Sequence, residues 1–317
     1  MRVGLLNNLR AGRSDAQVAR ALDLLRLYPD VVHVETDSAK VLPEALVEFS
    51  RQEVDLLVVN GGDGTLQYTL TELLANPDLA GVRAVAPLRG GRTNMTAMDL
   101  GAHRDPVAGL HALLEDAASG RLARRNVSRP VLRVHSNRRT EDQYGMFFGM
   151  GMLRRAVQLV HRTFSANQQG VFGAGLVTAA LLAKVFWRPT DGIMAPDKAE
   201  IRVDGKSLRD AEFYLVCASS LDRLFLRMNP FWGDGPGPVR FTAMSSRAQR
   251  IAIATPGILR GRPRAFVNAA NGYTSENAGR IELRLGSGFT IDGEIFDPSP
   301  DELVRVSADR RIQFVRA

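Results

Sequence analysis

The chain has 317 residues, enough for one large domain or two modest ones around a substantial core. Hydrophobic residues make up 45% and charged residues 24%, the usual values for a soluble globular protein. Cys217 is the only cysteine, which excludes an intrachain disulfide and a cysteine-based metal cluster and is compatible with a reducing cytoplasm. The net charge of +7 comes almost wholly from arginine and could meet nucleic acid, anionic lipid or nucleotide phosphates. No zinc-ligand spacing or RNA-binding aromatic signature is present, so we expect no nucleic acid partner.

The N-terminal part alternates short apolar runs with helical patterns. Strands are predicted at residues 2–6, 31–34, 54–59 and 82–88, and helices at residues 14–25, 43–51, 66–74 and 106–118. This alternation predicts an open parallel sheet covered on both faces, in which ligands bind beyond the carboxyl ends of the strands. Met1 leads straight into the first strand without the apolar core and cleavage site of a secretory signal, so we expect a cytoplasmic protein.

A glycine-rich turn, Gly61-Gly62-Asp63-Gly64-Thr65, follows the apolar run of the third strand. Its glycines allow backbone N–H groups to approach an anion, and the start of the next helix adds partial positive charge. Asp63 stands where a carboxylate can help to hold a Mg²⁺ that neutralises phosphates. A tight strand–helix turn with a capping aspartate is the alternative. Three glycines, an acid and Thr65 together favour phosphate binding.

A second glycine-rich loop, residues 87–101, follows the fourth strand. Gly91 gives backbone access, and the Asn94 side chain can both donate and accept hydrogen bonds. Arg89 or Arg92 can neutralise phosphate, and Thr93 supplies a hydroxyl. A turn with helix caps is the alternative, but two such loops after two adjacent strands favour a binding function.

Beyond Gly120 the apolar period changes to two. Two strands are predicted at the end of the chain, at residues 304–306 and 312–315. Before them, strands are predicted at residues 131–135, 145–149, 199–203, 212–218 and 239–241. This pattern predicts a second, mostly antiparallel domain. Residues 171–183 are almost entirely small or apolar but too few to span a bilayer, so we expect either a wall or lid of an acyl-chain pocket or an ordinary core helix.

Two carboxylates flank a glycine in Asp292-Gly293-Glu294, after an apolar β segment. Such a pair could serve as a general base and as a group that orients the substrate by a hydrogen bond. Asp-Gly alone is also a common hairpin turn. Because this segment lies downstream of both glycine loops, we favour the catalytic interpretation.

These motifs resemble a known family. Gly61 to Thr65 matches the GGDGT signature shared by diacylglycerol kinases, sphingosine kinases, bacterial lipid kinases and the more distant NAD kinases. Residues 87–101 resemble the family's second loop, although Arg92 and Met95 depart from its usual threonine and aspartate. Residues 292–294 reproduce its Asp-Gly-Glu. The chain is therefore similar to the diacylglycerol kinase catalytic-domain family over nearly its whole length.

The resemblance implies a fold and two cofactors. The fold is α/β, with an N-terminal open parallel-sheet, Rossmann-like nucleotide domain and a C-terminal, mostly antiparallel β-sandwich that receives lipid. ATP and Mg²⁺ are the implied cofactors, and Asp234 and Asp63 are the implied metal ligands. The implied nucleotide-binding residues are Asn7, Thr36, Gly61, Gly62, Asp63, Gly64, Thr65, Gly91, Arg92, Thr93 and Asn94.

The resemblance also implies an ATP-dependent kinase that phosphorylates a lipid hydroxyl, diacylglycerol-like by default. Glu294 would accept the hydroxyl proton and Asp292 would orient the hydroxyl, while Asp63 would coordinate metal or act as the base itself. No Gly-x-x-x-x-Gly-Lys-Ser/Thr segment exists, so the chain is not a P-loop kinase. Two alternatives stay open: a soluble-metabolite kinase of the NAD kinase type, and a non-catalytic nucleotide- or lipid-binding regulator.

The expected organisation has two domains. Residues 1–125 form the nucleotide domain, which residues 300–317 rejoin, and residues 126–299 form the lipid-substrate domain. The expected partners are a lipid substrate and, transiently, the inner face of a membrane, with a homodimer left open. The arginines expected to meet anionic headgroups are Arg154, Arg155, Arg162 and Arg188.

Overall fold

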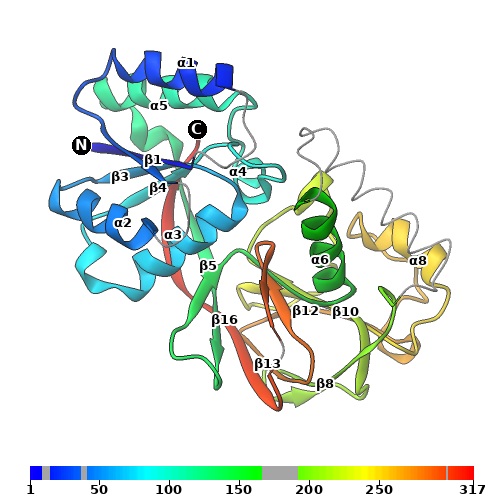
Figure 1. Cartoon of the computed structure of the whole chain (residues 1–317). Helices are drawn as coiled ribbons and strands as arrows, with labels where there is room; N and C mark the ends of the chain where they lie inside the picture. Colours follow the sequence, from blue (N-terminus) through cyan, green and yellow to red (C-terminus); the bar gives the residue numbers. More distant parts are fainter. Residues whose placement is uncertain (9–14, 37–40, 166–191, 298) are drawn as a thin grey trace. The chain divides into compact units, whose positions relative to one another are not determined.

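The structure is a computed structural model that describes residues 1–8, 15–36, 41–165, 192–297 and 299–317 (Figure 1). The chain divides into two compact units, one formed by Met1–Arg129 with Arg311–Ala317 and the other by Pro130–Arg310. Two strands, β5 (Asn126–Ser136) and β16 (Glu302–Val315), contribute residues to both units.

The first unit is built on parallel strands. These are β1 (Val3–Asn8), β2 (Val32–Thr36), β3 (Leu56–Asn60) and β4 (Ala84–Pro87). They lie in the order β2-β1-β3-β4, and Phe314 near the end of β16 pairs with Val85 of β4, also in parallel. Every residue of β3 is buried, as expected for a strand covered by helices on both faces of the sheet.

Helices follow the strands of this unit in alternation. They are α1 (Asp15–Leu25), α2 (Leu42–Arg51), α3 (Asp63–Ala75), α4 (Met95–Asp99) and α5 (Pro106–Ala118). The predicted helix at residues 106–118 is confirmed, and its start has a clear cause. The Asp105 carboxylate accepts a hydrogen bond from the Val107 N–H at 3.0 Å, and Pro106 occupies the first helical position. Leu110, Leu113 and Leu114 join the core shared with the strands.

Several boundaries differ from the sequence-based prediction, and those at the end of β1 and the start of α3 change where predicted binding residues lie. β1 continues through Asn8, so Asn7 and Asn8 are strand residues and not loop residues. Pairing with both β2 and β3 extends the strand beyond its apolar part. Helix α3 begins at Asp63, three residues earlier than predicted, with Gly62 as its N-cap. Asp63 therefore lies in the first helical turn.

The second unit is mostly antiparallel. Its further elements are β6 (Gln143–Gly145), β7 (Phe147–Gly151), α6 (Met152–Ser165), β8 (Asp197–Val203), β9 (Lys206–Ser207), β10 (Glu212–Ser219), β11 (Val239–Ser245), α8 (Ile251–Ile258), β12 (Tyr273–Ala278), β13 (Arg280–Leu285), β14 (Phe289–Ile291) and β15 (Glu294–Phe296). Strands β15-β14-β7-β10-β11-β12 run side by side, and β8, β13, β16, β5 and β6 form a second series. Buried side chains from both series make one core, in which period-two alternation is plain along β8.

The expected fold class, parallel strands with helices followed by an antiparallel region, is confirmed. One prediction within it is wrong: residues 304–306 and 312–315 belong to the single strand β16. Its polar middle, around Asp309 and Arg310, interrupts the apolar pattern without interrupting the strand, because residues 302–307 pair with β13 and Phe314 pairs with β4.

Some expectations fall on residues outside the described part of the chain. These are the apolar segment at residues 171–183, Arg188 and the helix start at Ser14. Among the described residues, no helix is both long enough and apolar enough to cross a membrane.

Candidate active site

Polar side chains are buried where the strands of the first unit end. Asn7 of β1 and Asn60 of β3 are register partners, and the Asn60 Nδ2 donates to Asn7 Oδ1 at 3.1 Å. Both side chains are buried, as is Thr36 at the end of β2, where it is the register partner of Asn8. The carboxyl edge of the sheet therefore carries amide and hydroxyl groups in place of apolar ones, which is where open α/β sheets bind ligands.

The glycine turn after β3 is tied to this edge. Thr65, in the first turn of α3, accepts a hydrogen bond on Oγ1 from Asn8 Nδ2 at 2.7 Å. Its side chain packs on Gly61, where an added Cβ would lie under 3.0 Å from Thr65 Cβ. Gly61 is therefore needed so that the helix can start so soon after the strand.

The two glycine-rich loops touch. A Cβ added to Gly91 would lie under 3.0 Å from the Cα of Gly62, a contact that real Cβ atoms essentially never make. Asp63 makes a second link, because its carboxylate accepts hydrogen bonds from the N–H groups of Met95 at 3.1 Å and Thr96 at 3.3 Å. The structure thus brings together the residues predicted in both loops.

Asn94 fixes the shape of the second loop. Its side chain accepts from the Gly91 N–H and donates to the Gly91 carbonyl, both at 2.7 Å, and its own backbone has φ +51°. Asparagine is among the few residues that tolerate this left-handed conformation. Arg92 and Thr93, between the two partners, are exposed. They are presented at the surface of the loop, as a group that meets a phosphate would be.

Two opposing influences act on the pKa of the Asp63 carboxyl. Burial raises the pKa of its carboxyl above the ordinary value, while hydrogen bonds from the backbone of Met95, Thr96 and Asn94 oppose the rise. The carboxylate is therefore already engaged in joining the loops. A metal ion bound by Asp63 would have to share its oxygens with these N–H groups.

A small cavity lies between the two loops. It has a volume of about 10 Å³ and is lined by residues of both, including Gly62, Asp63 and Asn94. That is room for about one water molecule.

In the second unit, Asp292 and Gly293 form the turn of the β14–β15 hairpin. Ile291 and Glu294 are register partners, and φ is +48° at Asp292 and +91° at Gly293, the pattern of a type I′ turn. The buried Asp292 carboxylate accepts a hydrogen bond from the Met146 N–H at 2.8 Å, and the backbone N–H of Asp292 donates to the Phe147 carbonyl. Asp292 thereby anchors the hairpin on β7.

Glu294 begins β15 and is half-buried. Burial raises the pKa of its carboxyl above the ordinary value, and interaction with His161 of α6 lowers it in part. Its backbone is held, since the Glu294 carbonyl accepts a hydrogen bond from Thr290 Oγ1 at 2.7 Å. A carboxylate with a raised pKa is a stronger base than an exposed glutamate, which suits proton abstraction.

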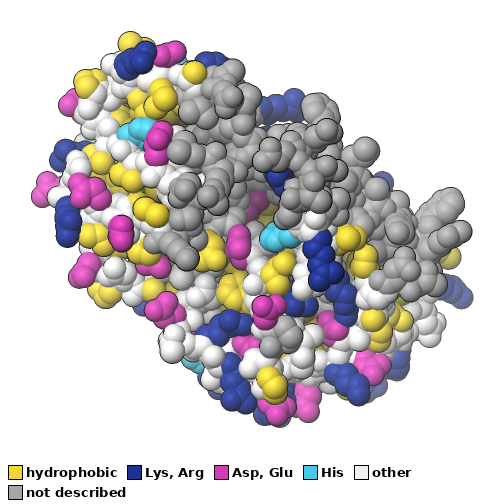
Figure 2. All heavy atoms as spheres, viewed as in Figure 1, with side chains coloured by type: hydrophobic (Ala, Val, Ile, Leu, Met, Phe, Trp, Pro, Cys, Tyr) yellow, Lys and Arg dark blue, Asp and Glu magenta, His cyan; other side chains and the backbone are white. Residues whose placement is uncertain are grey.

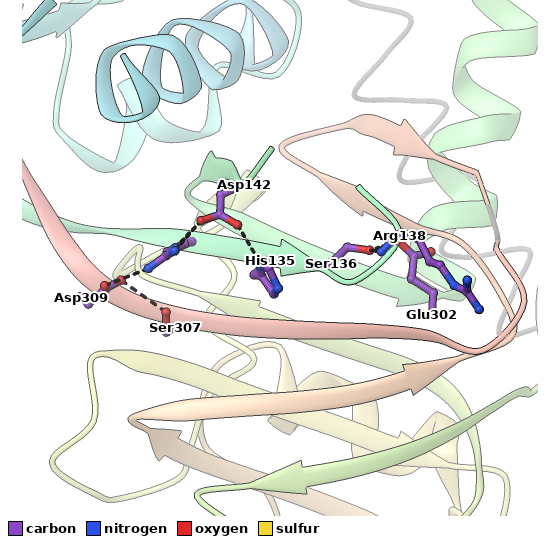
Figure 3. Close-up of polar contacts among 8 residues, drawn as sticks. His135, Ser136, Arg138, Asp142, Glu302, Ser307 and Asp309 are labelled. Carbon is purple, nitrogen blue, oxygen red and sulfur yellow. Dashed lines mark hydrogen bonds and ion pairs between the residues drawn. The ribbon is translucent and has the colours of Figure 1, made fainter. Parts of the chain in front are cut away.

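A buried carboxylate that the sequence analysis did not single out supports the same hairpin. Glu302 is fully buried and accepts a hydrogen bond from Ser136 Oγ at 2.5 Å (Figure 3). It also pairs with Arg139, whose Nε lies 3.3 Å away. The Arg139 guanidinium lies over the rings of Phe289 and Phe296, at 5.5 and 5.0 Å from their centroids. Burial together with the Arg139 contact marks this residue; Glu302 alone carries no signal in the sequence.

Figure 3 also shows a polar group formed by residues of β5 and β16 and by Asp142, which precedes β6. Asp142 accepts from His135 Nδ1 at 2.8 Å and from Arg133 at 2.6 Å, and Arg133 pairs with Asp309 as well. Burial alone would raise the pKa of Asp142, but the hydrogen bonds from His135 and Arg133 bring it below the ordinary value. The arrangement links the strands and presents no group poised for chemistry.

Asp234 lies in an exposed loop, and its predicted metal role finds no supporting cluster. Its backbone carbonyl accepts a hydrogen bond from the Asn277 N–H, and Gly233 and Gly235 press closely on the backbone of β12. These contacts account for the glycines without a metal. Within the described ranges, no group of three or more His, Cys, Asp or Glu residues could hold a metal ion.

The match to a known protein family falls within the first unit. Residues 2–122 match the family model described as "Diacylglycerol kinase catalytic domain". No curated protein matches the sequence significantly. Among solved structures, one from Bacillus anthracis str. Sterne described as a "putative diacylglycerol kinase" has a TM-score of 0.69 at 18% identity, and the match covers 100% of this chain and 97% of that one.

A second structure from the same organism, described as one of its diacylglycerol kinases, gives a TM-score of 0.61 at 16% identity. This match also covers 100% of the chain and 97% of the other protein. At such identities the two structures establish the shared fold, and the family model matches residues 2–122 of the chain.

Proposed function

We propose that the chain is an ATP-dependent kinase that phosphorylates a lipid hydroxyl, diacylglycerol-like by default, because residues 2–122 match the model of the diacylglycerol kinase catalytic domain. The observation that carries the proposal is the contact between the two glycine-rich loops after β3 and β4. In this contact Gly91 packs on Gly62, and the Asp63 carboxylate accepts hydrogen bonds from the second loop. These loops present backbone and arginine to an anion at the ligand-binding edge of the sheet.

Phosphoryl transfer makes mainly two demands on a protein, positioning and stabilisation of charge. The loop around Asn94 and the buried amides of Asn7 and Asn60 form a fixed platform for the polyphosphate. Arg92 supplies positive charge at the loop surface, in the absence of a P-loop lysine. Mg²⁺ bound with ATP would neutralise phosphate charge, and the Asp63 carboxylate would help to hold it at the loops.

The second unit supplies the base in this proposal. The lipid hydroxyl oxygen attacks the γ-phosphorus, the bond from that phosphorus to the bridging oxygen breaks, and ADP leaves. The hydroxyl proton passes to Glu294, whose raised pKa favours its acceptance. Asp292 acts by holding the hairpin that carries Glu294.

The test is phosphorylation with γ-labelled ATP. Incubation with total lipid extract should give a labelled product that partitions into organic solvent, and incubation with NAD should give none. A labelled NAD product in place of a lipid product would assign the chain to the soluble-metabolite kinases. Nucleotide binding without transfer to any lipid would make it a regulator and refute the proposal.

The role of Glu294 is tested by Glu294→Gln. This change should leave nucleotide binding intact and lower turnover by roughly 10²–10⁴-fold, the usual effect of losing a general base. Glu276→Gln, at an exposed position on β12, is the control and should turn over like the unaltered protein. Unchanged turnover in Glu294→Gln would remove Glu294 from the mechanism.

A further inference from the structure

Residues 235–275 carry six arginines and no acidic residue. The arginines are Arg240, Arg247, Arg250, Arg260, Arg262 and Arg264. Over the face of the molecule in Figure 2, acidic and basic side chains are both widely scattered, as is usual for soluble proteins. A segment of this length whose charged side chains are all basic is unusual by comparison, and it contains helix α8 of the second unit.

Three of these arginines have partners within the unit. Arg240 donates to the carbonyls of Leu221 and Asp222, and Arg247 pairs with Asp210. Arg250 lies over the ring of Phe266, 5.7 Å from its centroid. Their positions follow from the fold, so they do not need an external partner.

The other three arginines follow the end of α8 and are exposed. Arg260 donates to the carbonyl of Pro256, four residues earlier in the chain, at 3.0 Å. Arg262 and Arg264 have no acidic partner and no side-chain hydrogen bond within the part of the chain that the structure describes. Their charge is therefore not neutralised by the described protein.

Helix α8 presents an apolar face beside these arginines. Ala254 is fully buried on the inner side, in a cluster with Met244, Val267 and Tyr273. Ala252, Ile253 and Pro256 are exposed, and half of the Ile253 side chain is open to solvent. Residues spaced by three and four lie on one face of a helix, so these side chains form a single outer face that Arg260 continues.

The connection between helix and arginines is fixed. The Gly261 N–H donates to Ile258 and the Arg262 N–H donates to Gly257, each at 2.9 Å. Gly261 has φ +66° and approaches the carbonyl of Asn229, a position that a side chain would strain. The loop therefore holds Arg262 in place beside the apolar face.

We propose that this face docks onto an anionic lipid bilayer. The α8 surface consists of Ala252, Ile253, Pro256, Arg260, Arg262 and Arg264. Apolar side chains that enter the headgroup region, flanked by arginines that meet lipid phosphates, are the pattern of interfacial binding. A second copy of the chain fits less well, because a twofold contact would set the unneutralised arginines of both copies against each other.

The choice of a lipid bilayer rests on the proposed function, since a lipid kinase has to reach its substrate in a membrane. Docking itself needs neither ATP nor an acceptor hydroxyl. A chain that binds vesicles but phosphorylates no lipid would contradict the proposed function alone. A chain that phosphorylates lipid in detergent micelles but does not bind vesicles would contradict the proposed role of the α8 surface alone.

The experiment is cosedimentation of the full chain with vesicles, without ATP. The probes are vesicles of phosphatidylcholine alone and of phosphatidylcholine with phosphatidylglycerol. We expect binding to the anionic vesicles only, falling steeply as salt is raised. Arg262→Gln with Arg264→Gln should weaken that binding by at least about tenfold, since each basic group near the surface contributes several-fold.

Two further variants complete the test. Ile253→Asp should abolish binding, because a carboxylate replaces the apolar group and is repelled by anionic lipid. Arg202→Gln with Lys206→Gln removes the same charge from exposed positions on β8 and β9 and should bind like the unaltered protein. Thermal unfolding of each variant checks that it is folded. Absence of vesicle binding by the unaltered chain, or equal loss in the Arg202 and Lys206 control, would overturn the proposal.

Discussion

The raised pKa of Glu294 links its proposed role to the stability of the fold. Burial favours the protonated carboxyl in the folded state, so the unfolded chain releases this proton at a lower pH than the folded chain. The stabilising contribution of the protonated group is complete below the unfolded pKa and is lost as pH rises through the folded pKa. A charged Glu294 at neutral pH therefore lowers the free energy of unfolding.

This reasoning predicts the stability of Glu294→Gln. The variant should unfold at a higher temperature than the unaltered chain at neutral pH, and the difference should shrink as pH falls below the ordinary glutamate pKa of about 4.3. Thermal unfolding followed across this pH range measures the effect. The exposed Glu276→Gln should show no such pH dependence, and an equal dependence in both would mean that Glu294 is not specially placed.

Arg139 has two functions that a single substitution would remove. It is the charged partner of the buried Glu302, and it covers two rings of the β14–β15 hairpin. Arg139→Ala should lower the free energy of unfolding by about 3 kcal/mol, because breaking a buried ion pair leaves a charge without compensation. Denaturant unfolding gives this value.

The neighbouring residue provides the control. Arg138 is exposed, and its backbone N–H donates to Ser136 Oγ at 3.1 Å (Figure 3). Arg138→Ala should change the free energy of unfolding by less than about 0.5 kcal/mol. Similar values for the two alanine variants would show that Arg139 does not support the hairpin.

At the scale of whole elements, contact between the glycine-rich loops gives an asymmetric prediction. A Cβ on Gly91 would meet the Gly62 backbone at under 3.0 Å, whereas a Cβ on Gly62 would lie 3.5 Å from Gly91 Cα, an ordinary contact. Gly62 also has φ −89°, which any residue can adopt. The loops would have to separate to accept alanine at position 91 but not at position 62.

We therefore expect Gly91→Ala to lower the free energy of unfolding by about 1–3 kcal/mol, the usual result of overpacking, and to weaken ATP binding. Gly62→Ala should be markedly milder in stability. Calorimetric unfolding and fluorescence titration with an ATP analogue measure the two effects. Equal destabilisation by both substitutions would show that the loops are not in the contact described.

The sequence predicted those elements whose apolar pattern carries the information. The helix at residues 106–118 has a capping aspartate, a proline and regular leucines, and its bounds were found. The ends of β1 and the polar middle of β16 were missed, because hydrogen bonding to neighbouring strands extends both beyond their apolar residues. β12 was missed for a similar reason: most of its residues are polar, and pairing with β11 holds it.

In the candidate site too, features with a local sequence pattern could be predicted, and long-range contacts could not. Both glycine loops could be recognised, because each combines special backbone residues with a preceding strand. Their contact could not, since no local pattern shows that Gly91 meets Gly62 or that Asp63 bonds to Met95 and Thr96. The participation of Glu302 and Arg139 likewise depends on segments more than a hundred residues apart.

At the scale of the whole molecule, Cys217 reports on one unit alone. It lies in β10 of the second unit, is buried, and burial raises the pKa of its thiol to about 12. At neutral pH the thiolate fraction would be roughly 10⁻⁵, so the folded chain should not react with a disulfide reagent. In denaturant the single thiol should react with one equivalent.

The rate of thiol labelling through a denaturant titration therefore measures opening of the second unit. The helical signal in far-ultraviolet circular dichroism reports mainly on the first unit, because helices α1 to α5 lie there. Since β5 and β16 each contribute residues to both units, we expect the two signals to change together in one cooperative transition. Loss of helical signal well before the thiol becomes reactive would show that the first unit unfolds independently. Rapid labelling of the native chain would contradict the buried position of Cys217.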